Sequence, residues 1–289
     1  MSNQPIVYLN GDFLPASEAR VSVLDRGFIF GDGVYEVIPV YGGHLFRLDA
    51  HLARLDDSLV NIRLSAPYSH DKWREILAAL VARNGGKDLS VYLQITRGVA
   101  PRDHAFPKNV EPTVFAMANP LLPVPSQILR DGVAVITMDD FRWQNCHVKA
   151  IALLANILAR QQALDSGASE AVFVRDGQVT EGAASNLFYV KNRTLYTPPK
   201  GPRLLPGITR DLVLELAAAH HIPAQEVNFD VAALRSADEI WLTSSTKEIL
   251  PVTQLNGEPV GNGKPGPMWS RMLALYQEYK QQIREGRAA

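Results

Sequence analysis

The chain has 289 residues, of which 46% are hydrophobic and 20% are charged, so it can bury a sizeable core as one large or two ordinary domains. Twenty-nine basic residues against thirty acidic residues leave a formal charge of -1, which excludes the basic footprint of a nucleic-acid-binding protein and favours small-molecule partners. The single cysteine, Cys146, excludes an internal disulfide, no apolar run reaches the roughly 20 residues that span a bilayer, and Met1–Pro5 lacks the features of a signal peptide, so we expect a cytoplasmic protein.

The first 118 residues are expected to form a compact α+β unit, in which helices cover one side of a mainly antiparallel sheet. The pair Asn10 and Gly11 predicts a tight hairpin at its start. Leucine and isoleucine recur every three or four residues at 48–62, as apolar residues do at 73–81, which predicts two amphipathic helices. Strands are predicted where apolar runs are bounded by turn residues, at 6–9, 13–14, 34–38, 44–46, 89–96 and 113–118.

Three prolines between Asn119 and Pro125 predict an interdomain linker at 119–132, because proline resists both helix and central strand. The expected domains are therefore a small one at 1–118 and a larger, strand-rich α/β one at 133–289. In the larger domain, strands are predicted at 133–138, 171–175, 179–180, 187–190 and 239–242, and helices at 150–158, 212–219 and 268–284.

Lys149 ends a polar and aromatic loop, Phe141–Lys149, directly before the apolar helix that is predicted to begin at Ala150. A helix N-terminus carries partial positive charge, so a lysine held there and away from water is pushed toward its neutral, nucleophilic amine. Such an amine can form a Schiff base. This stretch alone leaves open the alternative of an ordinary lysine with a packed stem and a solvated ammonium.

Two further segments offer a carboxylate and an anion site. Glu181 lies between two predicted strands, where a half-buried carboxylate is costly unless it meets a cation or a proton donor. The segment 204–209 places a turn, free amides and the Thr209 hydroxyl at the start of a helix, which suits an anion. A solvated turn glutamate and a plain helix cap are the alternatives.

Two loops add groups that can bind phosphate or a carboxylate. The segment 243–246 offers four hydroxyls after an apolar strand, although loops rich in serine and threonine are common. Arg102 and His104 stand two residues apart in a long loop, where the arginine fork and the imidazole can clamp a carboxylate. A solvated basic loop would carry the same two residues.

Together these segments provide what pyridoxal phosphate needs: a lysine for its aldehyde, an acid for its ring nitrogen, and amides and hydroxyls for its phosphate. The seven histidines form no cluster with metal-ligand spacing, so no metal site is predicted. No glycine-rich fingerprint of the dinucleotide or P-loop type follows a predicted strand. Pyridoxal 5'-phosphate is therefore the cofactor that the residues favour.

The chain resembles the class IV aminotransferases, which are pyridoxal-phosphate enzymes of fold type IV, and among them the D-amino-acid transaminases. Order and spacing match along nearly the whole chain, which implies a two-domain fold with a small α+β N-terminal domain and a larger strand-rich C-terminal domain. The motifs that carry the resemblance are Phe30–Val37, Thr96–Gly98 with Pro101, Arg102 and His104, Cys146 with Lys149, Thr180–Gly182 with Ser185 and Asn186, Gly207–Arg210, and Thr243–Ser244 with Glu248 and Ile249.

The resemblance implies a role for each matched residue. Lys149 would hold the cofactor, Glu181 would pair with its ring nitrogen, and Leu205 would lie against the ring. Tyr35, Arg102 and His104 would trap the substrate α-carboxylate, and in a homodimer the loop of Arg102 and His104 would serve the partner's site. The remaining cofactor contacts would come from Arg54, Ser185, Gly207, Ile208, Thr209, Ser244 and Ser245.

The implied reaction is ping-pong transamination between a D-amino acid of the D-alanine type and a 2-oxo acid such as 2-oxoglutarate or pyruvate. The alternatives are a branched-chain L-amino-acid aminotransferase, an aminodeoxychorismate lyase, and a pyridoxal-phosphate-binding protein without turnover. The branched-chain enzymes typically show Phe-Glu-Gly-x-Arg where this chain reads Tyr35–Pro39, which favours the D-type interpretation. Three departures, Pro39, Ala183 and Ala184, leave the substrate range open.

Overall fold

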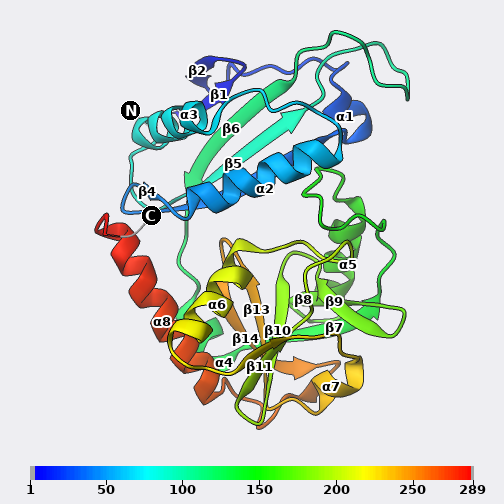
Figure 1. Ribbon diagram of the computed structural model, residues 1–289, viewed down its shortest axis with the longest axis vertical. Helices are drawn as coiled ribbons and strands as arrows, with labels where there is room; N and C mark the ends of the chain where they lie inside the picture. The colour runs from blue at the N-terminus through cyan, green and yellow to red at the C-terminus, as the bar shows by residue number, and fades with distance from the viewer. Residues whose placement is uncertain (1–3, 288–289) are drawn as a thin grey trace. The chain divides into compact units, whose positions relative to one another are not determined.

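The computed structural model describes residues 4–287, which contacts group into two units (Figure 1). The first unit contains the described residues up to Leu122, the short segment Val148–Ala152, and the residues from Lys280 onward. The second unit contains Pro123–His147 and Leu153–Tyr279. By its contacts, Lys149 therefore belongs to the first unit.

The first unit is built on a six-stranded sheet in the order β2-β1-β6-β5-β3-β4. Every strand pair in it is antiparallel, as predicted. The predicted hairpin is also present, since β1 and β2 pair antiparallel on either side of Asn10 and Gly11. These two residues take φ angles of 49° and 112°, and positive φ angles are typical of a two-residue hairpin turn. The strands are β1 (Ile6–Leu9), β2 (Asp12–Pro15), β3 (Gly33–Tyr41), β4 (His44–Leu45), β5 (Leu89–Thr96) and β6 (Thr113–Pro120).

Two long helices, α2 (Leu48–Asn61) and α3 (His70–Arg83), cover one face of this sheet (Figure 1). Leu52, Leu55 and Leu59 are buried on α2, and Trp73 is buried on α3, where they pack with apolar strand residues in one core. The two predicted amphipathic helices are thus confirmed. A third helix, α1 (Arg26–Phe30), lies before β3, where no helix was predicted.

The second unit holds a nine-stranded mixed sheet in the order β12-β11-β10-β13-β14-β7-β8-β9, with β15 paired to β14. Strand β7 pairs in parallel with β8 and β14, whereas β13 pairs antiparallel with β10 and β14. The strands are β7 (Val133–Asp139), β8 (Glu170–Arg175), β9 (Gln178–Gly182), β10 (Asn186–Lys191), β11 (Thr194–Thr197), β12 (Ala224–Glu226), β13 (Glu239–Ser244), β14 (Glu248–Leu255) and β15 (Glu258–Pro259).

The helices of the second unit differ from the sequence patterns at two places. Helix α4 (Ser126–Asp131) lies within the segment 119–132 that was expected to be an interdomain linker, although no helix was predicted there; the prolines of the segment end at Pro125 and leave the helix free of them. Helix α5 begins at Leu154 and not at Ala150. None of the helices in the described part of the chain has the length and hydropathy needed to cross a membrane. The remaining helices are α5 (Leu154–Asp165), α6 (Ile208–Ala219), α7 (Val231–Arg235) and α8 (Pro267–Arg284).

Candidate active site

Lys149 lies in a tight turn beside β3 and not at the start of a helix, since the Ala150 amide donates to the Val148 carbonyl at 2.8 Å. The Tyr35 amide donates to the Lys149 carbonyl at 3.0 Å, and the Ile151 amide donates to the Gly33 carbonyl at 3.1 Å. The edge of β3 offers these backbone groups, and pairing them outweighs the helical pattern of the apolar residues after Lys149. The predicted influence of a helix N-terminus on the Lys149 amine is therefore wrong, since α5 starts five residues later.

The Lys149 side chain is grouped with Tyr35. Its Nζ lies 4.2 Å from the centroid of the Tyr35 ring, and its backbone amide donates to the hydroxyl of the buried Ser58 at 3.2 Å. Tyr35 itself stacks on Tyr92, with the two ring centroids 5.7 Å apart. The lysine is thus held at its main chain and lies over an aromatic ring, which fixes the region that its amine can reach.

Arg54 is fixed by a buried carboxylate. Its Nε donates to Glu36 Oε1 at 2.8 Å and its Nη2 donates to Glu36 Oε2 at 2.7 Å, while His51 Nδ1 lies 2.8 Å from the same Oε2. Burial disfavours the Glu36 anion, yet Arg54 and His51 hold its pKa well below the usual value. Burial also lowers the pKa of His51. An arginine held in one plane in this way suits the oxygens of a phosphate.

Arg102 and His104, in the loop between β5 and β6, both lie against the aromatic ring of Phe30 in α1. The Arg102 guanidinium carbon lies 5.4 Å from the centroid of the Phe30 ring, and the His104 ring lies 5.5 Å from the same centroid. Both side chains are exposed to solvent. The structure therefore brings together the two residues that were expected to clamp a carboxylate, with Phe30 as their common support.

Glu181, at the end of β9, is buried and bonded through both of its oxygens. Arg142 Nη1 donates to Oε1 at 2.6 Å, while Asn186 Nδ2 and the Leu205 amide donate to Oε2 at 3.2 Å and 3.0 Å. Burial raises the pKa of Glu181 to about 7, although Arg142 opposes the shift. Since Arg142 is also paired with Asp140, its charge is shared between two carboxylates. The Glu181 carboxyl is thus poised between its two protonation states near neutral pH.

The first backbone amides of α6 are not capped by a side chain. The cap residue, Gly207, has no side chain that could accept from them. Ile208 and Thr209, the first two helical residues, are buried. Asn186 reaches this segment as well, because its Nδ2 donates to the Leu205 carbonyl at 2.8 Å. Uncapped amides and the helix dipole make this a favourable place for an anion.

Ser185 and Ser244 lie together in the second unit. They line a small cavity of about 10 Å³ together with Glu170 and Lys247. Thr243, the residue before Ser244 on β13, has a buried hydroxyl oxygen for which residues 4–287 provide no hydrogen-bond partner. Ser245 follows directly after β13. A buried hydroxyl without a partner is costly, and a phosphate oxygen would satisfy it.

The candidate residues thus fall into two sets. The first unit holds Lys149 and the residues expected to bind phosphate or substrate there, which are Tyr35, Arg54, Arg102 and His104. The second unit holds Glu181, Ser185, Leu205, Gly207, Ile208, Thr209, Ser244 and Ser245.

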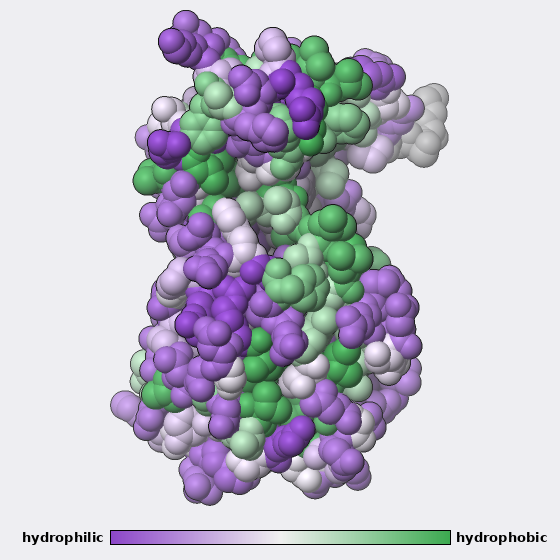
Figure 2. All heavy atoms as spheres, turned by 90° about the vertical axis from the view of Figure 1, so that its right-hand side faces the viewer, coloured by the Kyte–Doolittle hydropathy of each residue, from purple (hydrophilic) through white to green (hydrophobic). Residues whose placement is uncertain are grey.

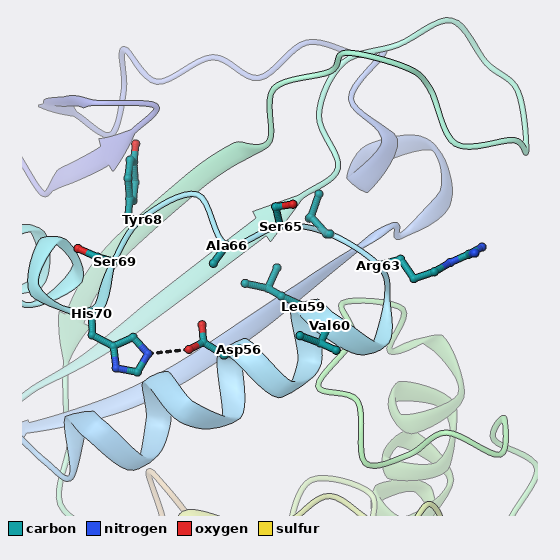
Figure 3. A pocket seen from close by; sticks show the side chains of 10 residues that line it. Asp56, Leu59, Val60, Arg63, Ser65, Ala66, Tyr68, Ser69 and His70 are labelled. Atoms are coloured by element: carbon teal, nitrogen blue, oxygen red, sulfur yellow. Dashed lines mark hydrogen bonds and ion pairs between the residues drawn. The ribbon is translucent and has the colours of Figure 1, made fainter.

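A separate cavity of about 590 Å³ lies between the end of α2 and the start of α3 (Figure 3). Leu59 and Val60 line it from α2, and His70 contributes an imidazole whose Nε2 lies 2.7 Å from Asp56 Oδ2 (Figure 3). None of the residues around it was expected in the site. Cavity size alone therefore does not locate the chemistry in this protein.

The sequence did not assign partners to Glu181 or Arg54. Arg142 stands 39 positions before Glu181, so no local pattern connects the two. His51, in contrast, stands three residues before Arg54 on a predicted helix and therefore on the same helical face, which was a usable signal. Arg142 also belongs to the polar loop that ends at Lys149, although that loop alone gave it no role.

A sequence model of the family described as amino-transferase class IV matches residues 33–255. The chain belongs to the class IV aminotransferases. It is 41% identical over 271 residues to a D-alanine aminotransferase of Bacillus licheniformis, covering 94% of this chain and 95% of the relative. A D-alanine aminotransferase of Staphylococcus aureus strain MW2 is 40% identical over 274 residues, which cover 94% and 97% of the two chains.

Solved structures of class IV aminotransferases share the fold of this chain. The branched-chain amino acid aminotransferase of Escherichia coli superposes with a TM-score of 0.88 at 27% identity, covering 95% of this chain and 94% of that one. A branched-chain enzyme from T.th. with pyridoxamine 5'-phosphate gives a TM-score of 0.89 at 27% identity, with coverages of 98% and 95%. The expected two-domain, fold type IV architecture is thereby confirmed.

Proposed function

We propose that this class IV aminotransferase moves the amino group of a D-amino acid, of the D-alanine type, to a 2-oxo acid such as 2-oxoglutarate or pyruvate, with pyridoxal 5'-phosphate as its cofactor. The observation that carries the handedness is the 41% identity to a D-alanine aminotransferase over 94% of the chain, against 27% to a solved branched-chain enzyme. Arg102 and His104, which both lie at the Phe30 ring, support the assignment as an aminotransferase, since they offer donors for the α-carboxylate that amino-acid substrates share.

The residues present fit this cofactor. Glu181 is a buried carboxylate with room in its lone pairs for one more donor, and the uncapped start of α6 and the unpartnered Thr243 hydroxyl within the described chain suit a phosphate. When bound, the cofactor supplies an aldehyde that takes up the amino group and a ring that accepts electrons from the substrate Cα. We assign its aldehyde to Lys149, its ring nitrogen to Glu181 and its ring face to Leu205. Its phosphate is assigned to Arg54, Ile208, Thr209 and Ser245, with Ser185, Gly207 and Ser244 beside them.

In this assignment each residue has a defined task. Lys149 removes the proton from the substrate Cα and returns it at the former aldehyde carbon, so one amine serves as both base and acid. Glu181, once ionised, holds a proton on the ring nitrogen. Arg102 and His104 bind the α-carboxylate, and together with Tyr35 they decide which face of the substrate meets the Lys149 amine.

A branched-chain L-amino-acid aminotransferase is the second candidate, because the solved structures named above are branched-chain enzymes and share the fold. The deciding assay offers the purified holoenzyme D-alanine or L-leucine, each with 2-oxoglutarate, and separately tests pyruvate release from aminodeoxychorismate. We expect turnover of D-alanine at least about tenfold above that of L-leucine, and no pyruvate from aminodeoxychorismate. Preferential turnover of L-leucine would contradict the D-type assignment.

Lys149→Ala is expected to reduce turnover of D-alanine by about 10³-fold or more, since one amine performs both proton transfers. The cofactor should still bind through its phosphate and ring contacts, but its absorbance band should change because the covalent attachment is lost. Lys191→Ala is the matched control, because this surface lysine pairs with Asp238 in the second unit and has no task in the reaction. A Lys149→Ala enzyme with full turnover would rule out the assignment.

We also propose a homodimer. Val23 and Phe28 of the first unit are 70% and 76% exposed, and Leu154 and Ile157 on α5 are 69% and 61% exposed. Figure 2 shows apolar side chains at the surface of each unit. Large apolar side chains are stabilised when they leave water, so a second copy of the chain is a suitable cover for them. The cytoplasmic location stays a prediction, which fractionation of expressing cells would test.

A further inference from the structure

Asp32 is a largely buried carboxylate directly before β3. It is shared by two buried arginines, Arg26 and Arg97. Arg26 Nε and Arg97 Nε each donate to Asp32 Oδ2 at 2.8 Å, and Arg97 Nη2 donates to Oδ1 at 3.0 Å. Both arginines are only 4% exposed. Burial disfavours the Asp32 anion, but the two guanidinium groups hold its pKa below the usual value. One carboxylate therefore fixes the orientation of two cations, and neither arginine was assigned a role above.

Arg26 donates through its Nη1 to the main chain around His104. Its Nη1 donates to the Asp103 carbonyl at 2.5 Å and lies 3.3 Å from the Ala105 carbonyl. These carbonyls belong to the residues immediately before and after His104. The backbone that carries this imidazole is thus tied directly to an arginine whose own position is set by Asp32.

Arg97 supports the far side of the same loop. Its guanidinium carbon lies 3.8 Å from the centroid of the Phe106 ring, and its Nη groups donate to the carbonyls of Ile62 at 2.7 Å and Arg63 at 3.2 Å. Arg63 also lies over the Phe106 ring, at 5.0 Å. Phe106 is 47% exposed, so the arginine contact rather than burial keeps its ring in place.

Phe30 completes the arrangement at the end of α1. Its ring centroid lies 4.9 Å from the Arg26 guanidinium carbon, in addition to its contacts with Arg102 and His104. Arg26 therefore contacts both the backbone of the loop and the Phe30 ring, against which Arg102 and His104 of that loop lie. The loop 98–112 has no helix or extended strand of its own, so these contacts hold the part around His104, while backbone hydrogen bonds from Arg26 to Gly98 and from Ala100 to Leu24 hold its start.

We propose that Asp32 is a positioning residue for substrate binding: through Arg26 and Arg97 it holds the loop 98–112 in the conformation in which Arg102 and His104 receive the substrate carboxylate. This rests on the proposed function, which assigns the carboxylate to those two residues. Asp32 itself touches neither substrate nor cofactor in this proposal. Its contribution is to remove the cost of ordering an exposed loop when substrate binds.

The test is the Asp32→Asn holoenzyme, in which one charge is lost and the side-chain shape is kept. We expect the KM for D-alanine and for 2-oxoglutarate to rise about tenfold, with kcat changed less than about twofold and cofactor absorbance unchanged, because binding is lost without loss at the chemical step. Asp49→Asn is the matched control, since Asp49 forms an exposed arginine–carboxylate pair with Arg74 in the same unit. It should leave both constants at wild-type values.

A double-mutant cycle separates this inference from the proposed function. If Asp32 acts through Arg102, Asp32→Asn should raise KM much less in an Arg102→Gln background than in the wild type. An Arg102→Gln enzyme with wild-type KM would overturn the assigned role of Arg102, and the inference with it. A raised KM in Arg102→Gln combined with an unchanged KM in Asp32→Asn, or with fully additive effects, would overturn the inference alone.

A second variant decides the matter if Asp32→Asn does not fold. Phe106→Leu removes the ring beneath Arg97 at an exposed position, where a leucine is tolerated. We expect its KM for both substrates to rise about threefold at unchanged kcat. A Phe106→Leu enzyme with wild-type KM would overturn the proposal.

Discussion

The Glu181 carboxyl is a buried acid whose partner cation, Arg142, is shared with Asp140. Its pKa therefore rises from about 4.5 in an exposed chain to about 7 in the folded protein without cofactor. Between these values the folded state holds a proton that the unfolded state has released. By linkage, this group makes the apoprotein less stable as the pH rises from about 4.5 to about 7.

Glu181→Gln removes this dependence, because glutamine does not titrate. We expect the melting temperature of the wild-type apoprotein, measured at about pH 5 and about pH 7.5, to fall with pH by on the order of 5 °C more than that of the variant. Glu258→Gln changes an exposed glutamate of β15 and should follow the wild type. Parallel melting curves for the wild type and Glu181→Gln would contradict the raised pKa.

Lys149 shows what the sequence could and could not provide at the scale of a residue. Its identity as the candidate amine followed from the motifs around it, but its surroundings did not. The apolar run after it predicted a helix from Ala150, whereas the segment pairs with Gly33 and Tyr35 of a strand far earlier in the chain. Only the folded chain shows that this strand edge is available.

Among the elements, α6 offers a sharp test because its first turn is packed against Asn186. A Cβ built on Gly207 would overlap the Asn186 side-chain oxygen, while the backbone of Gly207, at φ −72° and ψ 134°, suits any residue. Gly207→Ala should therefore displace Asn186 and weaken its bonds to Glu181 and the Leu205 carbonyl. We expect the Kd for pyridoxal phosphate to rise about tenfold.

The matched control is Gly201→Ala, earlier in the same segment, where an added Cβ would meet no atom within 4 Å. Fluorescence titration of the two apoproteins with the cofactor gives both Kd values. A Gly201→Ala protein that binds as the wild type does would show that an added methyl group in this region is harmless. Equal cofactor affinity in Gly207→Ala would show that Asn186 can shift without consequence for the site.

The elements that sequence patterns predicted are those with strong internal periodicity. Helix α2 and strand β5 were predicted within a residue or two, because their buried positions alternate with the period of each structure. Strand β14 was missed since it contains Pro251, which is unusual between two neighbouring strands. Helix α1 was missed because Gly27 lowers helix propensity, and its cap, the Asp25 side chain bonded to the Gly27 amide at 2.7 Å, is visible only in three dimensions.

For the whole molecule, the proposed homodimer makes a prediction that one chain cannot satisfy alone. If Arg102 serves the partner's site, a mixed dimer of a Lys149→Ala chain and an Arg102→Gln chain has one site with both native residues. Random mixing puts half of the dimers in this class, so activity at low substrate should recover to about one quarter of the wild type. If Arg102 serves its own chain, mixing should restore nothing above the Arg102→Gln level.

At this scale the sequence predicted the family and the two-part architecture through its motifs, since Lys149, Glu181 and the Gly207–Arg210 segment occur in family order. The sequence did not predict that the short segment Val148–Ala152 groups by its contacts with the N-terminal sheet. Spacing along the chain carries no information on which strand edge such a short segment will join. Long-range pairings of this kind depend on packing that no local pattern encodes.

The pairing of Lys149 with β3 has a consequence for solubility. Strand β4 covers β3 only at Val40 and Tyr41, and the segment through Lys149 and Ile151 covers the same strand near Gly33 and Tyr35. An uncovered strand edge is a template on which strands of other chains can add. The segment that carries Lys149 therefore also prevents this edge of β3 from pairing with strands of other chains. Remodelling it to accept new substrates must keep its two backbone hydrogen bonds, or the product will be a chain that assembles through its sheets.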